Sequence, residues 1–332
     1  MKKILLITTG GTIASIQTEK GLIPGIDGKQ LITFIPQLKN MCEINVISLF
    51  NLDSTNIYYK HWLLLANTIQ KNYDNYDGFI ICHGTDTMGY TASALSYLIQ
   101  NSRKPIILTG AQKPINLEIS DAKTNLLDSF TYACSKYAKG VVLIFNGNVI
   151  LGTRARKTRT KSFNAFSSID FPRIAIIKDE HVIPYITDLN EDTVFYNKLN
   201  PNVALLKLIP GMDSTIFEYI LNKHDAVIIE SFGVGGLPNY DHSNYNELIN
   251  KYTKLGKVIV MTTQVPNEGS DIAIYQVGNY LKENEYILEA YDMTTEAVVT
   301  KLMWILAYTK DIKEIKKLFY QTISQDILFK KY

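Results

Sequence analysis

Short apolar runs rich in β-branched residues recur along the chain and alternate with segments of helical periodicity. The runs predict strands at residues 4–8, 44–49, 79–82, 105–109, 141–145 and 174–178. Apolar positions at helical spacing predict helices over 55–72, 88–99 and 125–137. Because strand–helix alternation is typical of βαβ units, we expect a parallel sheet with helices on both faces.

The alternation is interrupted by a polar stretch and then resumes. Residues 188–193 are polar, and Pro201 between two asparagines disfavours regular structure. We therefore expect a larger N-terminal α/β domain over 1–185, a linker over 186–202 and a smaller C-terminal α/β domain over 203–332. For the C-terminal domain the pattern predicts about four strands, three of them at 203–208, 226–231 and 257–262, and helices near 213–223, 243–254 and 294–308.

Composition narrows the classes of protein. The chain has 46% hydrophobic and 20% charged residues and a formal net charge of +2, which is typical of a globular protein and argues against a nucleic-acid partner. A basic cluster at 154–161 has no interleaved aromatic residues for base stacking, so a solvated loop is the simpler interpretation. The three cysteines are widely spaced and no apolar run is long enough to cross a membrane. We expect a cytoplasmic protein that does not associate with membranes.

Hydroxyl, acidic and basic side chains follow the predicted strands. Thr12 comes after a Gly-Gly turn, Thr85 and Asp86 follow the third strand, and Lys157 lies in the predicted loop 146–157. The carboxyl ends of parallel strands share one edge of a sheet, where ligands bind. Each residue also has a simpler interpretation: Asp86 could cap the next helix, and Lys157 could be one solvated charge among several. Their joint occurrence at one edge favours a site.

The chemistry of that site is constrained by what the sequence lacks. It has no dinucleotide fingerprint, phosphate loop, nucleophile elbow or histidine pair at metal-ligand spacing, so we expect neither a cofactor nor a metal. A threonine hydroxyl needs an adjacent base, and a neutral lysine is the candidate. Carboxylates can bind an ammonium group, and hydroxyls with turn N–H groups can bind a carboxylate. The pattern favours acyl transfer on a small zwitterion.

The chain resembles the bacterial-type L-asparaginases, most of all their cytoplasmic type I branch. The resemblance runs nearly end to end and is carried by T-G-G-T-I-A at 9–14, D-S-T at 53–55, H-G-T-D-T-M at 83–88, L-T-G-A-Q at 108–112 and D-M-T-T-E-A at 292–297. It implies hydrolysis of L-asparagine to L-aspartate and ammonia without a cofactor. It also implies a homodimer or a dimer of dimers.

The resemblance assigns roles to individual residues. Thr12 matches the nucleophile that forms an acyl-enzyme, and Thr85, Lys157 and Asp86 match a second catalytic group in which the lysine accepts a proton through Thr85. The residues matched to substrate binding are Asp53, Ser54 and Thr55 for the carboxylate, Asp86 for the α-amino group, Thr85, and the Ala111 carbonyl for the scissile amide.

Two further positions concern the surroundings of the nucleophile. Tyr275 matches a tyrosine that a partner protomer sometimes contributes to the site. Many relatives carry a tyrosine in the loop after the first motif, where this chain has Leu22. Because leucine cannot accept a proton, we expect Thr12 to be activated by water, by Tyr275 or by the Thr85–Lys157 pair.

Two other functions fit the same motifs. An asparaginase-like subunit of a tRNA-dependent amidotransferase would need extra N-terminal sequence, and here Met1 almost adjoins the first strand, which argues against it. A non-catalytic amino-acid sensor is the second alternative. The presence of Thr12, Thr85, Asp86 and Lys157 together argues against a loss of catalysis.

Overall fold

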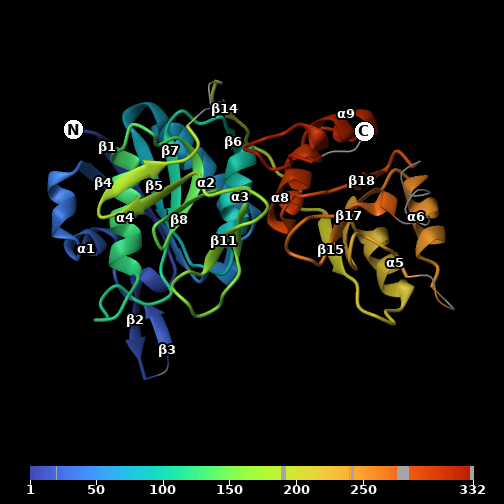
Figure 1. Ribbon diagram of the computed structural model, residues 1–332, viewed down its shortest axis with the longest axis horizontal. Coiled ribbons are helices and arrows are strands. Elements are labelled where there is room, and N and C mark those ends of the chain that lie inside the picture. The colour runs from blue at the N-terminus through green and yellow to red at the C-terminus, as the bar shows by residue number, and fades with distance from the viewer. Residues whose placement is uncertain (20, 188–191, 239, 241–242, 275–283, 330–332) are drawn as a thin grey trace. The chain divides into compact units, whose positions relative to one another are not determined.

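An eight-stranded sheet organises the N-terminal unit, Met1–Asn197 (Figure 1). The computed structural model describes all residues except 20, 188–191, 239, 241–242, 275–283 and 330–332. Five neighbouring strands of the sheet are parallel, in the order β4 (Glu43–Leu52), β1 (Lys3–Gly10), β5 (Gly78–Cys82), β7 (Pro105–Thr109), β8 (Gly140–Phe145). Nearly every residue of β1, β5 and β7 is buried, as expected for strands covered on both faces. The predicted parallel α/β architecture is confirmed.

The remaining three strands of this sheet are antiparallel. They are β9 (Asn148–Leu151), β12 (Ala175–Lys178) and β13 (His181–Pro184). Asn146 and Gly147 have φ values of 50° and 69°, which is the backbone conformation of a two-residue hairpin turn. The chain therefore turns back after β8, and the prediction of an uninterrupted loop over 146–157 is wrong.

Helices cover both faces of the sheet. α1 (Gly28–Thr33) and α4 (Ala122–Cys134) pack on one face, in a core that includes Leu6, Ile80 and Val142. α3 (Met88–Leu98) packs on the other face, and α2 (Tyr59–Asn72) packs beside it. The connections β5–α3–β7 and β7–α4–β8 step in the same direction along the sheet but place their helices on opposite faces. They therefore have opposite handedness, although almost all such connections in proteins are right-handed.

A close approach of backbone to helix guides the chain from β9 towards the strand ends. A Cβ on Gly152 would lie 2.6 Å from Ser96 Oγ and 2.7 Å from the Ala92 carbonyl oxygen of α3. The Gly152 carbonyl also accepts a hydrogen bond from Ser93 Oγ at 3.0 Å. β10 (Ala155–Lys157) then packs beside α3 and pairs with β11 (Phe166–Ser168). Lys157 is thus carried by a short strand to the N-terminal end of α3.

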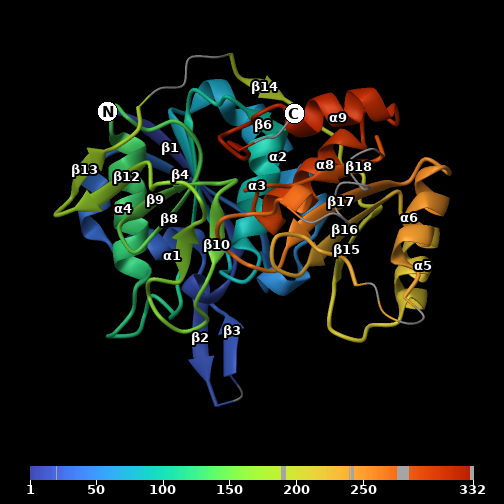
Figure 2. The same cartoon turned by 45° about the vertical axis from the view of Figure 1, so that its right-hand side comes forward.

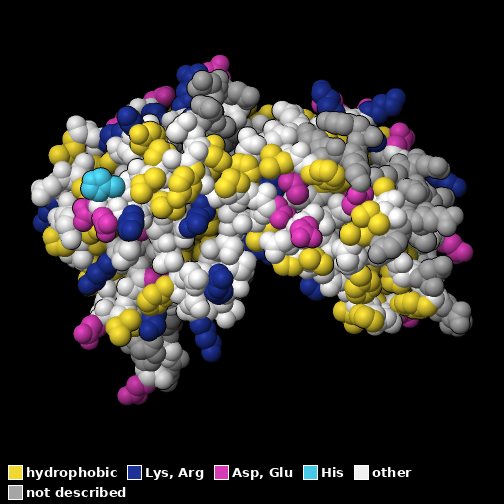
Figure 3. Space-filling model, in the orientation of Figure 1, with side chains coloured by type: hydrophobic (Ala, Val, Ile, Leu, Met, Phe, Trp, Pro, Cys, Tyr) yellow, Lys and Arg dark blue, Asp and Glu magenta, His cyan; other side chains and the backbone are white. Residues whose placement is uncertain are grey.

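The basic cluster is only partly the solvated loop that the sequence suggests. Arg154 is completely buried, its guanidinium carbon lies 5.7 Å from the centre of the Phe171 ring, and Nη1 donates to the Ile169 carbonyl. Side chains 158–162 are exposed, in agreement with the prediction. On the face of the N-terminal unit drawn in Figure 3, basic side chains are scattered among acidic and hydrophobic ones.

Shorter elements complete the N-terminal unit. An antiparallel hairpin of β2 (Ser15–Thr18) and β3 (Gly21–Pro24) projects away from the main sheet (Figure 2). β6 (Ile99–Gln100) pairs with β14 (Val194–Phe195), which lies within the predicted linker. Single 3₁₀ turns occur at η1 (Thr12–Ala14), η2 (Pro36–Asn40), η3 (Ser54–Asn56) and η4 (Tyr73–Asn75). Cys42, Cys82 and Cys134 are all free thiols.

The C-terminal unit, Lys198–Tyr332, contains a smaller parallel sheet. Its strands, in order, are β15 (Val203–Lys207), β16 (Ala226–Ser231), β17 (Val258–Thr263) and β18 (Ile287–Glu289). The helical elements are α5 (Ser214–Lys223), α6 (Tyr245–Thr253), η5 (Ile272–Ile274), α8 (Thr295–Ile305) and α9 (Ile312–Tyr320). The predicted smaller α/β unit is confirmed. No helix in the described part of the chain is long and apolar enough to cross a membrane.

Candidate active site

Two glycine turns pack against each other at the ends of β1 and β5. Gly11 has a φ of 84°, in the region that favours glycine, and a Cβ on it would lie 2.5 Å from the backbone of Gly84. A Cβ on Gly84 would lie 2.7 Å from Ser54 Oγ. Glycine at these two positions therefore allows the segments that carry Thr12, Ser54 and Thr85 to come together.

The segment after β5 is held in place by the buried side chain of His83. This residue is completely buried, with Nδ1 2.7 Å from the Gly84 carbonyl oxygen and Nε2 2.9 Å from Thr91 Oγ1. Trp62 Nε1 donates to the same Thr91 hydroxyl at 3.0 Å. Burial lowers the pKa of His83 to about 4, so its imidazole is neutral at pH 7. His83 therefore orients the turn and does not line the pocket.

The segment after β4 forms a tight turn against Asp86. Asp53 caps η3: its Oδ1 accepts from the Thr55 backbone N–H and from Thr55 Oγ1, both at 2.9 Å. Buried Ser54 accepts from the Asp86 backbone N–H through Oγ at 3.3 Å, and its carbonyl accepts from Thr87 Oγ1 at 2.7 Å. Asp53 is therefore the N-cap of η3 and fixes the turn that carries Ser54 and Thr55.

These turns surround a pocket of about 140 Å³. Its lining residues include five of the predicted site residues: Thr12, Asp53, Ser54, Thr85 and Asp86. Thr55, Ala111 and Lys157 are not among the lining residues, and Ala111 is buried. The pocket is much smaller than the roughly 300–1,000 Å³ clefts that bind drug-sized ligands, so it suits a small molecule.

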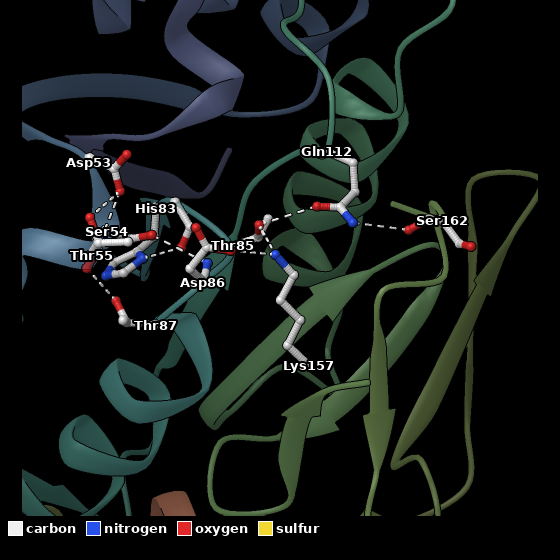
Figure 4. A network of polar contacts seen from close by, with 11 residues as sticks. Asp53, Ser54, Thr55, His83, Thr85, Asp86, Thr87, Gln112, Lys157 and Ser162 are labelled. Atoms are coloured by element: carbon white, nitrogen blue, oxygen red, sulfur yellow. Dashed lines mark hydrogen bonds and ion pairs between the residues drawn. The ribbon is translucent and has the colours of Figure 1, made fainter. Parts of the chain in front are cut away.

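Lys157 bridges Thr85 and Asp86, two residues that line this pocket (Figure 4). Its ammonium nitrogen lies 2.7 Å from Thr85 Oγ1 and 2.6 Å from Asp86 Oδ1. The lysine side chain is 17% exposed and the aspartate side chain 57% exposed. An ammonium group donates and cannot accept, so in this arrangement Thr85 and Asp86 both accept from Lys157. The exposed flank of Asp86 leaves room for a second cation.

Thr12 lines the same pocket from the turn that follows β1. Its side chain is half-buried at the start of η1, and Oγ1 has no hydrogen-bond partner among the residues that the structure describes. The pocket thus presents an unengaged hydroxyl from one turn and the Thr85–Lys157–Asp86 group from another. This is an arrangement that can bind a small polar molecule and attack it from the Thr12 side.

Two residues of the network were not predicted. Thr85 Oγ1 donates to Gln112 Oε1 at 3.2 Å, and Gln112 Nε2 donates to the Ser162 carbonyl at 3.2 Å (Figure 4). Gln112 is the last residue of the L-T-G-A-Q motif and follows β7, so the sequence could have indicated it as a site residue. Ser162 lies in no motif, so the sequence could not have indicated it. Leu22 lies on β3, and Tyr275 lies outside the described residues.

Within the described chain, no group of three or more histidine, cysteine, aspartate or glutamate side chains is placed to hold a metal ion.

The chain belongs to the asparaginase family. It matches the N-terminal asparaginase domain over residues 3–188 and the glutaminase/asparaginase C-terminal domain over residues 202–319. It is 37% identical to an L-asparaginase of Thermococcus kodakarensis, over 98% of this chain and 99% of the relative. It is 30% identical to L-asparaginase 1 of Escherichia coli, over 98% of each chain.

A second group of relatives consists of amidotransferase polypeptides. The chain is 32% identical to one component of the glutamyl-tRNA(Gln) amidotransferase of Pyrococcus horikoshii, over 98% of this chain but only 76% of that polypeptide.

Among solved structures, the thermostable L-asparaginase of Thermococcus kodakarensis superposes with a TM-score of 0.91 at 36% identity, covering 99% of this chain and 100% of that one. A probable cytoplasmic L-asparaginase of Campylobacter jejuni superposes with a TM-score of 0.83 at 27% identity, covering 96% and 99%.

Proposed function

We propose that this protein hydrolyses L-asparagine to L-aspartate and ammonia with Thr12 as the nucleophile. The observation that carries the proposal is the small pocket in which Thr12 faces the Thr85–Lys157–Asp86 group. The full-length similarity to L-asparaginases supports the choice of substrate.

The pocket has polar groups that can bind both the ammonium end and the carboxylate end of the substrate. The half-exposed carboxylate of Asp86 binds the α-ammonium group, and Asp53 and Ser54, with the turn N–H groups beside them, line the end that receives the α-carboxylate. A substrate ammonium at Asp86 competes with Lys157 for the carboxylate. Because the ammonium form of a lysine is stabilised by a nearby anion, this competition favours the neutral amine that a base requires.

The reaction follows from these positions. Thr12 Oγ1 attacks the carbon of the side-chain amide, and its proton passes through Thr85 Oγ1 to neutral Lys157. The C–N bond breaks, the proton is returned to the leaving nitrogen, and ammonia departs, which leaves an ester on Thr12. Water then attacks the ester by the same proton route and releases aspartate.

Two alternative functions are less well supported. The amidotransferase polypeptides are less similar than the Thermococcus kodakarensis enzyme and are matched over a smaller share of their length. A sensor would bind asparagine without consuming it.

Incubation of the purified protein with L-asparagine tests the proposal directly. We expect ammonia and aspartate in a one-to-one ratio, with no added cofactor, metal or tRNA. L-Glutamine should react more slowly, since one extra methylene is worth about 1–3 kcal/mol of discrimination in a tight pocket. Binding of asparagine, measured by calorimetry, with no ammonia released would favour the sensor.

We also infer that the active species is a homodimer or a dimer of dimers and that it works in the cytoplasm. The exposed flank of Asp86 and the predicted contribution of Tyr275 from a second copy support the first inference. The three free thiols and the resemblance to type I enzymes support the second.

Dilution tests the assembly. If a second copy completes the site, specific activity and the dimer should disappear with the same midpoint in parallel activity and sedimentation titrations. A monomer that keeps full activity would contradict the inferred assembly.

Cell fractionation tests the location. Recovery of the native protein outside the cytoplasm would contradict the proposed location.

A further inference from the structure

Gln112 is anchored by its backbone to the start of α4. Its N–H lies 3.0 Å from each carboxylate oxygen of Asp121, the buried residue that precedes this helix. Asp121 Oδ2 also accepts from Asn125 Nδ2 at 3.1 Å, and the same amide donates to the Gly110 carbonyl at 2.9 Å. The Gln112 side chain therefore starts from a fixed point, and from there it contacts the Thr85 hydroxyl.

The Gln112 amide connects the Thr85 hydroxyl to the loop between β10 and β11, residues 158–165. Oε1 accepts from Thr85 Oγ1 and Nε2 donates to the Ser162 carbonyl, each at 3.2 Å (Figure 4). The neighbouring Lys113 contacts the same loop, because its Nζ lies 5.8 Å from the centre of the Phe163 ring. The hydrogen bond from Gln112 thus ties the loop to the strand end, and Lys113 lies against the loop beside it.

Ser162 fixes which way the amide points. A backbone carbonyl can only accept a hydrogen bond, so the NH₂ group of Gln112 must face Ser162 and the amide oxygen must face Thr85. The opposite orientation would place two carbonyl oxygens together and leave two donors, the amide and Lys157, competing for the Thr85 oxygen. Gln112 is therefore an acceptor towards Thr85.

This orientation sets the direction of the hydroxyl hydrogen. Lys157 donates to Thr85 Oγ1 at 2.7 Å, so the hydrogen of Thr85 points away from the lysine and towards Gln112. When Lys157 is neutral, the same hydrogen can turn to the amine nitrogen, and Gln112 Oε1 loses its donor. The Thr85 hydroxyl therefore donates to Gln112 throughout the ammonium state, whereas Gln112 competes with the amine nitrogen for this hydrogen when Lys157 is neutral.

We propose that Gln112 is a positioning residue for the hydrolysis, which orients the Thr85 hydroxyl and stabilises the state in which Lys157 has received the proton. This inference rests on the proposed function. By favouring the ammonium state, Gln112 assists proton transfer from the nucleophile through Thr85, and Ser162 makes that assistance depend on the position of the 158–165 loop.

Two substitutions of Gln112 should move the pH profile in opposite directions. Gln112→Leu removes the acceptor, so we expect kcat to fall about tenfold, the effect of roughly one hydrogen bond, with less than a threefold change in KM. The acidic limb of the kcat profile should move to lower pH, since the ammonium state is less favoured. Gln112→Glu keeps an acceptor towards Thr85, loses the donor to the Ser162 carbonyl and adds a negative charge, so the limb should move to higher pH while kcat on the alkaline plateau recovers to within about threefold of the parent.

Lys113→Met is the matched control. It changes the net charge by the same single unit as Gln112→Glu, one residue away, and removes a contact to the same loop without touching Thr85. We expect the parental acidic limb and a parental kcat. Thermal unfolding of all three variants checks that the fold is retained.

The outcomes distinguish a failure of the proposed function from a failure of the proposed role of Gln112. An inactive parent protein would overturn the proposed function itself. An active parent together with Gln112 variants that keep its acidic limb would overturn only the role of Gln112. A purely structural role would lower the midpoint of thermal unfolding and raise KM in both variants with the limb unmoved, and this result would also overturn the inference.

Discussion

Replacement of Thr12 by alanine is expected to abolish asparagine hydrolysis and leave the fold intact. The loss in kcat should be about 10⁴-fold or more, the scale seen when an enzyme loses its nucleophile. Stability should hardly change, because the Thr12 hydroxyl makes no hydrogen bond with the described residues and lies on a turn. Ammonia release and thermal unfolding measure the two effects separately.

A control and a second variant sharpen this test. Thr68→Ala removes an exposed threonine hydroxyl on α2, outside the pocket, and should keep parental activity. Thr85→Val should be nearly as damaging as Thr12→Ala. If the two threonines act in one reaction, the double variant should be no worse than the more severe single variant. Comparable turnover in Thr12→Ala and the parent would rule out Thr12 as nucleophile.

Replacement of Lys157 by arginine is expected to lower the kcat of asparagine hydrolysis as much as replacement by methionine does. Arginine keeps the positive charge beside Asp86 but stays protonated, so it cannot accept a proton from Thr85. We expect kcat to fall about 100-fold or more in both variants, the usual scale for a general acid–base group. Steady-state assays near neutral pH and at alkaline pH make the measurement.

The comparison of the two Lys157 variants distinguishes three roles for the residue. If Lys157 only supplies positive charge, Lys157→Arg should retain much of the activity and Lys157→Met little. If it is merely a solvated charge, both should behave like the parent, as we expect for Lys161→Met in the exposed loop that follows β10. Near-parental turnover in Lys157→Arg would exclude the lysine as a base.

The sequence predicts the sheet and the strand ends well because both depend on local pattern. Apolar runs place β1, β5 and β7, and the parallel arrangement then requires Thr12, Ser54 and Thr85 to share an edge. The glycines that follow β1 and β5 permit the close packing of the two turns. This much follows from periodicity and backbone sterics.

The route of Lys157 could not be predicted in the same way. It depends on a hairpin after β8, on the approach of Gly152 to α3, and on a short strand that pairs with β11. The burial of Arg154 and the contact between Gln112 and Ser162 are likewise tertiary, since the partners lie far apart in sequence. Charge patterns alone suggest solvent exposure for such residues, and packing overrides that suggestion here.

The most direct test of the proposed mechanism is to look for the ester on Thr12. The enzyme is mixed with excess L-asparagine, quenched in acid during turnover, digested and analysed by mass spectrometry. We expect an aspartyl adduct on the peptide that contains Thr12, absent from Thr12→Ala and increased in a variant whose deacylation is slowed. An adduct on Thr85 or any other residue, or steady turnover by Thr12→Ala, would contradict the mechanism.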